Sequence, residues 1–251
     1  MTSLWQDVRT IARGWRWTRR PLVPRTAEPF VEVRDRREFP TAWARSRPGR
    51  AARNVLQRVG LKPLVWAEVQ PHVTGLDRLD GVDPPVVFAS NHASHLDAPL
   101  VLCALPRRWR DRTATAAAAD YFFDAWWRAT TTTLVFNAFP VDRGAGRITA
   151  TPGRLLRAGW NLLIFPEGTR SADGWVQRFR GGTAWLCVDE HVPAVPVAIR
   201  GTFDAMPRGR GWPRAGRPAV SVRFGTPLLP EEGETFAAFN ARLQQAVARL
   251  L

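Results

Sequence analysis

The chain has 251 residues, 45% of them hydrophobic and 23% charged, a mixture that is typical of a globular domain and excludes a disordered protein. Its formal net charge of +14 is carried almost entirely by arginine, which predicts a phosphate-bearing partner: nucleic acid, an anionic membrane or a phosphorylated substrate. No apolar run is long enough to span a bilayer, and Cys103 and Cys187 lie in apolar runs, so we expect reduced thiols in the cytosol and no disulfide scaffold.

The first 60 residues are strongly basic, with 14 arginines against five acidic residues. Within them, Leu4, Val8, Ile11 and Trp15 recur at helical spacing, and arginines lie on the other side. This pattern predicts a helix in the interface of an anionic membrane or, alternatively, a surface helix packed on the domain. Because residues 21–48 are rich in Pro and Arg, they predict an extended arm. We expect residues 1–50 to form this membrane-interface segment and residues 51–251 to form the main domain.

After residue 51, short apolar runs alternate with helical patterns. The runs that predict strands are 64–69, 85–89, 113–118, 136–141, 161–165, 194–199 and 220–224. The segments that predict helices are 97–105, 122–130, 149–158, 183–191 and 235–251. This alternation predicts an α/β fold with a mainly parallel central sheet that is covered by helices.

Three polar clusters, residues 91–97, 142–143 and 166–171, each follow directly on a predicted strand. The carboxyl ends of the strands in an open parallel sheet share one edge, where ligands bind. We therefore expect the three clusters to meet at one site.

The first cluster reads NHASHLD and contains a candidate general base. His92 and Asp97 are five residues apart, so on a regular helix they would point in different directions and can meet only across a turn. Ser94 is a candidate helix N-cap, which would place Asp97 in the first helical turn, within reach of His92. The carboxylate would then fix the imidazole tautomer and raise the basicity of its other nitrogen. Alternatively, Asp97 only caps the helix and His92 is an ordinary turn residue.

The third cluster, PEGTRS, contains a candidate phosphate site. Gly168 permits a tight turn, and Thr169 and Arg170 offer a hydroxyl and a guanidinium group. Arg143 adds a second guanidinium group from another strand end. Two arginines beside backbone N–H groups are suited to clamp a phosphate, although either arginine alone could serve as a solvated surface residue.

Four sequence blocks together resemble a known family. They are NHxSxxD at Asn91–Asp97, FxVDR at Phe139–Arg143, FPEGTRS at Phe165–Ser171 and VPAVPV at Val192–Val197. In this order they resemble the four motifs of the glycerolipid acyltransferase family, whose bacterial type member is 1-acyl-sn-glycerol-3-phosphate acyltransferase. The string FRGG at residues 179–182 matches a further family feature, whereas Asn137 departs from the glycine that usually begins the second block.

The resemblance implies acyl transfer from acyl-CoA or acyl-carrier protein to the hydroxyl of 1-acyl-sn-glycerol 3-phosphate, giving phosphatidic acid without an acyl-enzyme intermediate or a further cofactor. His92 is then the general base and Asp97 its partner. The residues implied to build the acceptor site are Arg143, Glu167, Gly168, Thr169 and Arg170. Glu167 is unexpected beside an anionic ligand and is predicted to orient an arginine. Pro196 is predicted to shape a groove for the acyl donor.

The residues agree with direct transfer, because the chain has no G-x-S-x-G elbow and neither cysteine lies beside a base. No metal is expected, since no second His or Cys stands at ligand spacing. The alternatives that stay open are another acceptor (glycerol 3-phosphate, an amino-acid lysolipid or a glycolipid), a nucleic-acid-binding protein and an inactive membrane-surface scaffold. Without a zinc-finger or RNP-like motif, we expect no nucleic-acid partner, and we expect peripheral association with the cytoplasmic face of the cell membrane.

Overall fold

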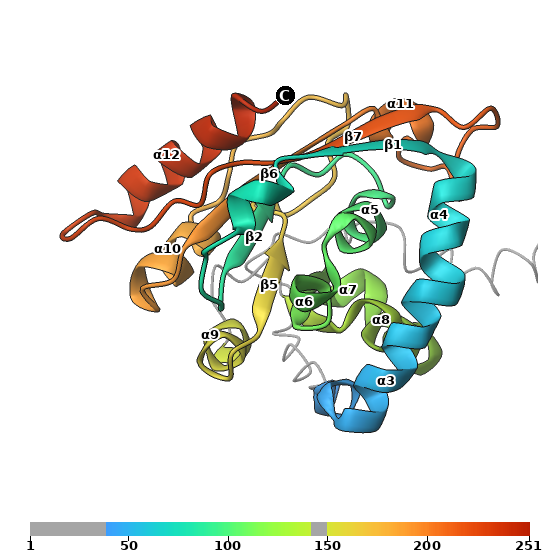
Figure 1. Cartoon of the computed structure of the whole chain (residues 1–251), viewed down its shortest axis with the longest axis horizontal. Coiled ribbons are helices and arrows are strands. Elements are labelled where there is room, and N and C mark those ends of the chain that lie inside the picture. Colours follow the sequence, from blue (N-terminus) through green and yellow to red (C-terminus); the bar gives the residue numbers. More distant parts are fainter. Residues whose placement is uncertain (1–38, 142–149) are drawn as a thin grey trace, which may run out of the picture. The chain divides into compact units, whose positions relative to one another are not determined.

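A seven-stranded sheet forms the centre of the described part of the chain (Figure 1). The computed structural model describes residues 39–141 and 150–251, so the predicted N-terminal amphipathic helix and Arg143 lie outside the described residues. The strand order is β1-β7-β6-β2-β5-β3-β4. Neighbouring strands are parallel except β6 and β7, which are antiparallel. The predicted α/β fold with a mainly parallel sheet is confirmed.

After residue 85 the strands follow the predicted ones closely, whereas the predicted helix at residues 122–130 is displaced, because residues 123–125 are not helical and the helix covers Trp126–Phe136. The strands are β1 (Gln70–Thr74), β2 (Val87–Ser90), β3 (Thr113–Ala118), β4 (Ala138–Val141), β5 (Asn161–Ile164), β6 (Ala194–Arg200) and β7 (Ala219–Phe224). The α-helices are α3 (Arg47–Val55), α4 (Lys62–Glu68), α5 (Asp97–Ala104), α6 (Arg107–Arg110), α7 (Ala119–Phe122), α8 (Trp126–Phe136), α9 (Ala150–Arg157), α10 (Gly182–Asp189), α11 (Thr202–Ala205) and α12 (Phe236–Ala248). The short segments η2 (Ala42–Arg45) and η4 (Leu76–Leu79) are 3-10 helices, and η3 (Leu56–Leu61) is a π-helix.

The predicted strand at residues 64–69 is wrong, because this segment belongs to a helix. Segments α3, η3 and α4 follow one another without interruption and form a rod of residues 47–68. Val65 and Val69 are buried four residues apart, whereas Leu64 is exposed. This is helical spacing, which a short apolar run cannot reveal by itself. The first strand is instead β1, an edge strand beside β7.

Residues 39–50 belong to the same unit as the rest of the described chain, Phe39–Leu251. The predicted extended arm is not observed over residues 42–48, which are largely helical, and residue 50 lies inside α3. The Ser46 hydroxyl caps α3 by accepting from the Gly49 N–H at 3.2 Å, and a proline stands in the first turn. Buried Arg53 donates to the Ala44 carbonyl at 2.7 Å and so holds η2 against α3.

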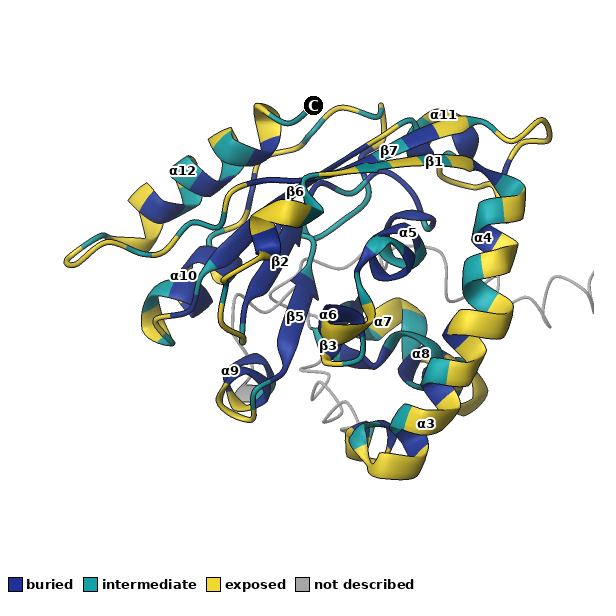
Figure 2. Cartoon of the chain, in the orientation of Figure 1, coloured by how far each residue is buried: buried dark blue, intermediate teal, exposed yellow. Residues whose placement is uncertain are grey.

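Helices cover both faces of the sheet and bury its central strands (Figures 1 and 2). Successive residues of a strand face opposite sides. Accordingly, Val87 and Leu162 pack in the cluster that includes α10 and α12, whereas Phe88 and Leu163 pack in the cluster that includes α4 and α5. Burial on both faces is typical of parallel strands. No helix in residues 39–141 or 150–251 is both long and apolar enough to cross a membrane.

Asn91 extends the sheet beyond the last residue of β2. Its Nδ2 donates to the Ile199 carbonyl and its Oδ1 accepts from the Ile199 N–H, both at 2.8 Å. The side-chain amide thereby takes the place of a neighbouring backbone strand and fixes the start of the 91–97 turn against β6.

Replacing Asn91 by Ala should destabilise the fold. The change leaves the Ile199 N–H and carbonyl buried without a partner, and each such loss costs about 1–3 kcal/mol. Urea unfolding should show a lower midpoint with an unchanged slope. Asn240→Ala is a matched control, because it removes only a single, partly buried bond to the Phe179 carbonyl. An Asn91→Ala midpoint equal to that of the wild type would contradict this role.

Candidate active site

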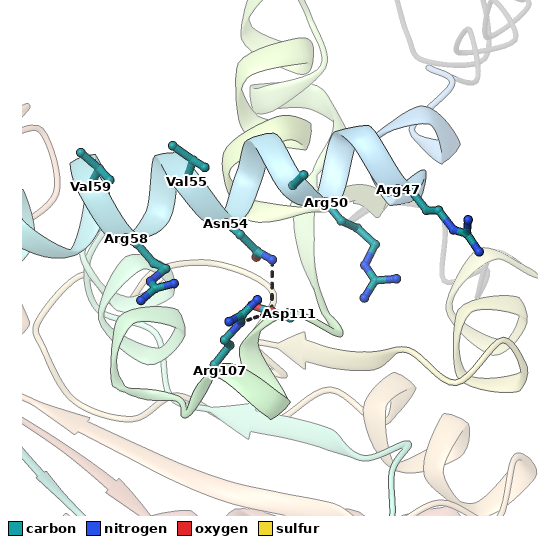
Figure 3. Close-up of a pocket in the computed structure, with 9 residues that line it drawn as sticks. Arg47, Arg50, Asn54, Val55, Arg58, Val59, Arg107 and Asp111 are labelled. Carbon is teal, nitrogen blue, oxygen red and sulfur yellow. Dashed lines mark hydrogen bonds and ion pairs between the residues drawn. The ribbon is translucent and has the colours of Figure 1, made fainter.

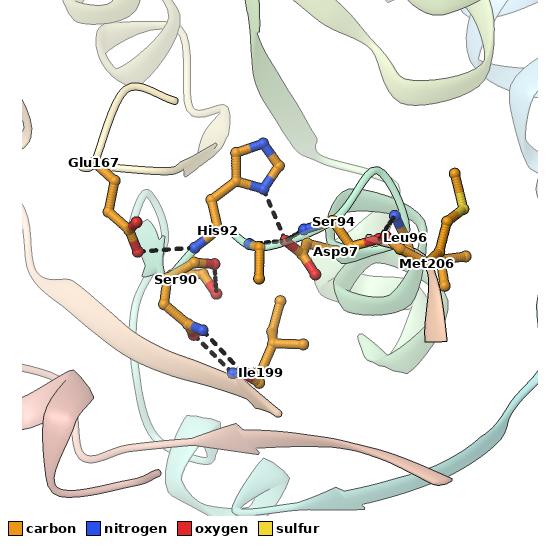
Figure 4. Close-up of polar contacts among 10 residues, drawn as sticks. Ser90, His92, Ser94, Leu96, Asp97, Glu167, Ile199 and Met206 are labelled. Atoms are coloured by element: carbon orange, nitrogen blue, oxygen red, sulfur yellow. Dashed lines mark hydrogen bonds and ion pairs between the residues drawn. The ribbon is translucent and has the colours of Figure 1, made fainter. Parts of the chain in front are cut away.

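His92 and Asp97 meet at the carboxyl edge of the sheet (Figure 4). The His92 Nδ1 atom lies 2.8 Å from Asp97 Oδ2. Asp97 is the first residue of α5 and is fully buried, whereas 19% of the His92 side chain is exposed. The turn between them gives the contact that the spacing predicted.

One carboxylate oxygen determines the tautomer of His92. Besides the imidazole, Asp97 Oδ2 accepts from the backbone N–H groups of Ala93 at 2.7 Å and Ser94 at 2.8 Å. An oxygen that already accepts two hydrogen bonds requires a donor from the ring, so Nδ1 carries the proton and Nε2 is left as an acceptor. An imidazole in this state can take a proton at Nε2.

Ser94 acts differently from the predicted N-cap. Helix α5 begins at Asp97 with Leu96 at its N-cap position. The Ser94 hydroxyl accepts from the Leu96 N–H at 3.2 Å and donates to the Met206 carbonyl at 2.7 Å. Because Met206 follows β6 and α11 along the chain, Ser94 ties the 91–97 turn to a second segment at the same edge of the sheet.

The loop after β5 holds the backbone of His92 from both sides. The His92 N–H donates to Glu167 Oε1 at 2.9 Å, and the Ser171 N–H donates to the His92 carbonyl at 2.7 Å. The ring of Phe165 stacks on the imidazole, with 4.1 Å between centroids and 21° between planes. The first and third polar clusters therefore meet as predicted, and both the backbone and the ring of His92 are fixed.

Gly168 makes the turn that brings the PEGTRS loop back toward His92. Its φ of +73° favours glycine, and its N–H donates to the Phe165 carbonyl at 3.0 Å. A Cβ at this position would lie only 2.9 Å from Arg180 Nε, so the guanidinium group of Arg180 lies against the turn. Thr169 and Arg170 follow on the same loop and are half-buried. Arg143 is outside the described residues.

Burial changes the protonation of two side chains here. Burial raises the pKa of Glu167 to about 7, and the carboxylates of Asp97 and Asp173 add to this effect, while N–H groups of His92 and Gln177 oppose it. Burial lowers the pKa of His95 to about 4, and the positive charge of Arg170 acts in the same direction. His95 is therefore neutral near pH 7, with its ring stacked on Tyr121 at 5.4 Å.

The other candidate residues lie apart from this cluster. Pro196 is buried within β6, where it packs against Gly225. Burial raises the pKa of Cys103 and of Cys187 to about 12, which disfavours a nucleophilic thiolate at either position. No group of three His, Cys, Asp or Glu side chains that could hold a metal occurs in residues 39–141 and 150–251.

Several residues of the site were not assigned a role from the sequence. Phe165 and Asn91 occur in the FPEGTRS and NHxSxxD blocks, and Arg180 occurs in the FRGG string, but these patterns do not indicate what their side chains contact. Their positions in the family-like motifs indicate that they belong to the site, but their contacts depend on how distant segments pack. Phe165 stacks on the imidazole, whereas Asn91 and Arg180 hold the two segments that meet beside it.

Comparison with known proteins agrees with this geometry. The model of the Acyltransferase family matches residues 70–200, just over half of the chain. A chloroplastic 1-acyl-sn-glycerol-3-phosphate acyltransferase of Brassica napus is 28% identical over 155 residues, covering 58% of this chain and 43% of that protein. A lyso-ornithine lipid O-acyltransferase of Pseudomonas aeruginosa is 29% identical over 161 residues, covering 62% of this chain and 59% of that protein. The chain thus spans less than half the length of the first of these relatives.

Among solved structures, the 1-acyl-sn-glycerophosphate acyltransferase PlsC of Thermotoga maritima matches with a TM-score of 0.62 and 22% identity, covering 83% of this chain and 85% of that chain. This likeness shows that the fold is shared. The matched family region includes His92, Asp97 and the PEGTRS loop. The chain belongs to the Acyltransferase family.

Proposed function

We propose that this protein transfers an acyl group from a thioester to the free hydroxyl of 1-acyl-sn-glycerol 3-phosphate, giving phosphatidic acid. The observation that carries this proposal is the His92–Asp97 pair, which leaves Nε2 as an acceptor and is held by Glu167 of the PEGTRS loop at the carboxyl edge of the sheet (Figure 4). The donor would be acyl-CoA or acyl-carrier protein. The enzyme would work as a peripheral protein on the cytoplasmic face of the cell membrane, where its acceptor lies.

The proposed reaction needs a single base. The acceptor hydroxyl gives its proton to Nε2 of His92 while its oxygen attacks the thioester carbonyl carbon. The carbon–sulfur bond then breaks and the thiolate leaves, taking up the proton from the imidazolium. Asp97 stabilises the imidazolium while it exists. General-base assistance of this kind is typically worth a factor of about 10² to 10⁴ in rate.

Acceptor binding is assigned to the loop after β5. Arg170 and Arg143 would hold the phosphate, with Thr169 and the backbone of Gly168 beside them. Glu167 would act as a positioning residue, because it holds the His92 N–H rather than offering charge to the substrate. At pH values below about 7 its carboxyl is mostly neutral, which suits an anionic ligand nearby. Pro196 would shape the wall of the acyl-donor groove.

His92→Gln should lower kcat by about 10² to 10⁴, because the base is lost while the turn is preserved. Asp97→Asn should also lower kcat, since an amide cannot accept from Nδ1 and both backbone N–H groups in the same way. Release of free thiol from acyl-CoA with 1-acylglycerol 3-phosphate measures both effects. His72→Gln, an exposed histidine on β1, is the matched control and should retain full activity. Undiminished turnover in His92→Gln would refute the mechanism.

Glu167→Gln should make stability less dependent on pH. The folded state holds the Glu167 proton up to about pH 7, whereas the unfolded chain releases it near pH 4.5. The folded state therefore binds more protons across this window, so the wild type loses stability as pH rises through it. Relative to wild type, the variant should gain up to about 3 kcal/mol between pH 4.5 and pH 8, at 1.36 kcal/mol per pKa unit.

Urea unfolding at several pH values measures this difference. Glu232→Gln at an exposed position is the control and should change the free energy of unfolding only slightly. If the difference in free energy of unfolding between Glu167→Gln and wild type stays constant from pH 4.5 to pH 8, the raised pKa of Glu167 is contradicted.

Arg170→Gln should raise KM for a phosphate-bearing acceptor about 10- to 100-fold, the loss expected for a hydrogen bond to a charged group. The relative that acts on lyso-ornithine lipid makes an amino-acid lysolipid a second candidate acceptor. A panel of 1-acylglycerol 3-phosphate, glycerol 3-phosphate and lyso-ornithine lipid separates the two. If Arg170→Gln affects all acceptors equally, Arg170 does not recognise phosphate. Turnover of only lyso-ornithine lipid would replace the proposed acceptor.

A further inference from the structure

An open groove lies between the rod of residues 47–68 and helix α6, and it shares no lining residue with the site of His92 (Figure 3). Its volume is about 720 Å³. The lining residues are Arg47, Arg50, Ala51, Asn54, Val55, Arg58, Val59, Arg107 and Asp111. Four arginines and one acidic residue give this wall a strong positive charge. The π-helical segment η3 forms part of it, and such segments are frequent at functional sites.

The acidic group in the groove is already occupied. Asp111 Oδ2 accepts from Arg107 Nε and from Asn54 Nδ2, each at 3.1 Å. No ion pair joins Arg47, Arg50 or Arg58 to an acidic residue in the described part of the chain. Three guanidinium groups on one side of the rod therefore have no anionic partner within the described protein.

A further positive charge lies behind this wall. Arg53 is 1% exposed, and burial, followed by the charge of Arg50, lowers its pKa to about 10. Arg50 Nε is itself buried and has no hydrogen-bond acceptor among residues 39–141 and 150–251. The Arg50 guanidinium lies over the Trp160 ring, 5.8 Å from its centroid, and Asp111 offsets only part of the positive charge. A cluster with this net positive charge is favourable for an anionic ligand, and guanidinium groups bind phosphate in bidentate fashion.

Apolar side chains border the arginines on the same rod. Val55 and Val59 are 61% and 75% exposed, although valine is usually buried. Figure 3 shows Arg50, Asn54 and Arg58 turned toward Asp111, whereas Val55 and Val59 project away from it. Cationic groups beside exposed apolar groups match the interface of a membrane, where phosphates lie next to acyl chains.

We propose that this groove is a non-catalytic site for the phosphate of an anionic phospholipid at the membrane surface, with Val55 and Val59 against the adjoining acyl region. The proposal rests on the proposed function in one respect, since a lipid acceptor places the enzyme at a membrane. The groove thus supplies an anchoring contact separate from the binding of substrate.

The test compares two full-length variants that lose the same charge. The groove variant is Arg47→Gln/Arg50→Gln/Arg58→Gln, and the control is Arg78→Gln/Arg200→Gln/Arg249→Gln, three exposed arginines elsewhere. Sedimentation with vesicles of phosphatidylcholine, with and without phosphatidylglycerol, measures partitioning. We expect the groove variant to bind anionic vesicles at least about tenfold more weakly than the control, because each arginine at the surface contributes to lipid affinity.

Two further variants separate the charge from the apolar contact. Arg47→Lys/Arg50→Lys/Arg58→Lys should restore much of the binding to anionic vesicles. Val55→Ser/Val59→Ser should weaken binding to them while leaving the dependence on phosphatidylglycerol intact. Thermal melts of all variants check the fold, and a groove variant that melts early is replaced by the single changes Arg47→Gln and Arg58→Gln at exposed positions.

The proposal is overturned if the groove variant and the control partition alike, or if wild type does not prefer anionic vesicles. It is also overturned if the groove variant loses affinity for free CoA, or for an acidic acyl-carrier protein, while vesicle binding is unchanged, because the groove would then hold a soluble donor. Acyl transfer to a monomeric short-chain acceptor without vesicles should be equal in wild type and groove variant. Absence of turnover in both would instead count against the proposed function.

Discussion

The site depends on one buried oxygen atom. Asp97 Oδ2 accepts from the imidazole of His92 and from two consecutive backbone N–H groups, so a single atom sets the turn, the start of α5 and the tautomer of the base. A carboxylate that also closes a backbone turn cannot rotate away from the ring without breaking that turn. The geometry of the His92–Asp97 pair is therefore preorganised by the fold itself.

The parallel sheet brings together the segments that hold the 91–97 turn. Strands β2, β5 and β6 are adjacent and parallel, so the chain leaves all three at the same edge. The segment after β5 holds the His92 backbone through Glu167 and Ser171, and the segment after β6 receives the Ser94 hydroxyl at Met206. Among residues 39–141 and 150–251, every long-range hydrogen bond to the 91–97 turn thus comes from β6 or from the segments that follow β5 and β6. An insertion in either loop would act directly on the orientation of His92.

The sequence predicted the sheet class, the strands after residue 85 and the His92–Asp97 contact, because buried parallel strands and polar strand ends leave clear local patterns. It could not predict α4, since Leu64–Val69 is too short a run to separate helix from strand. It also could not show that Glu167 holds a backbone N–H or that Arg180 packs on Gly168, because both contacts join segments that only the folded sheet brings together. Local sequence motifs thus located the candidate site, whereas the contacts that hold His92 and the PEGTRS loop in place became visible only in the folded structure.

The electrostatics of the edge follow from the same packing. An anion site tolerates nearby acids only if their charge is suppressed, and burial holds the pKa of Glu167 at about 7. Burial and the charge of Arg170 similarly lower the pKa of His95 to about 4, so its imidazole is neutral near pH 7. Below about pH 7, both Glu167 and His95 are therefore mostly uncharged until His95 protonates near pH 4. For the proposed reaction, this low negative charge would favour a phosphate at the same edge as the imidazole of His92.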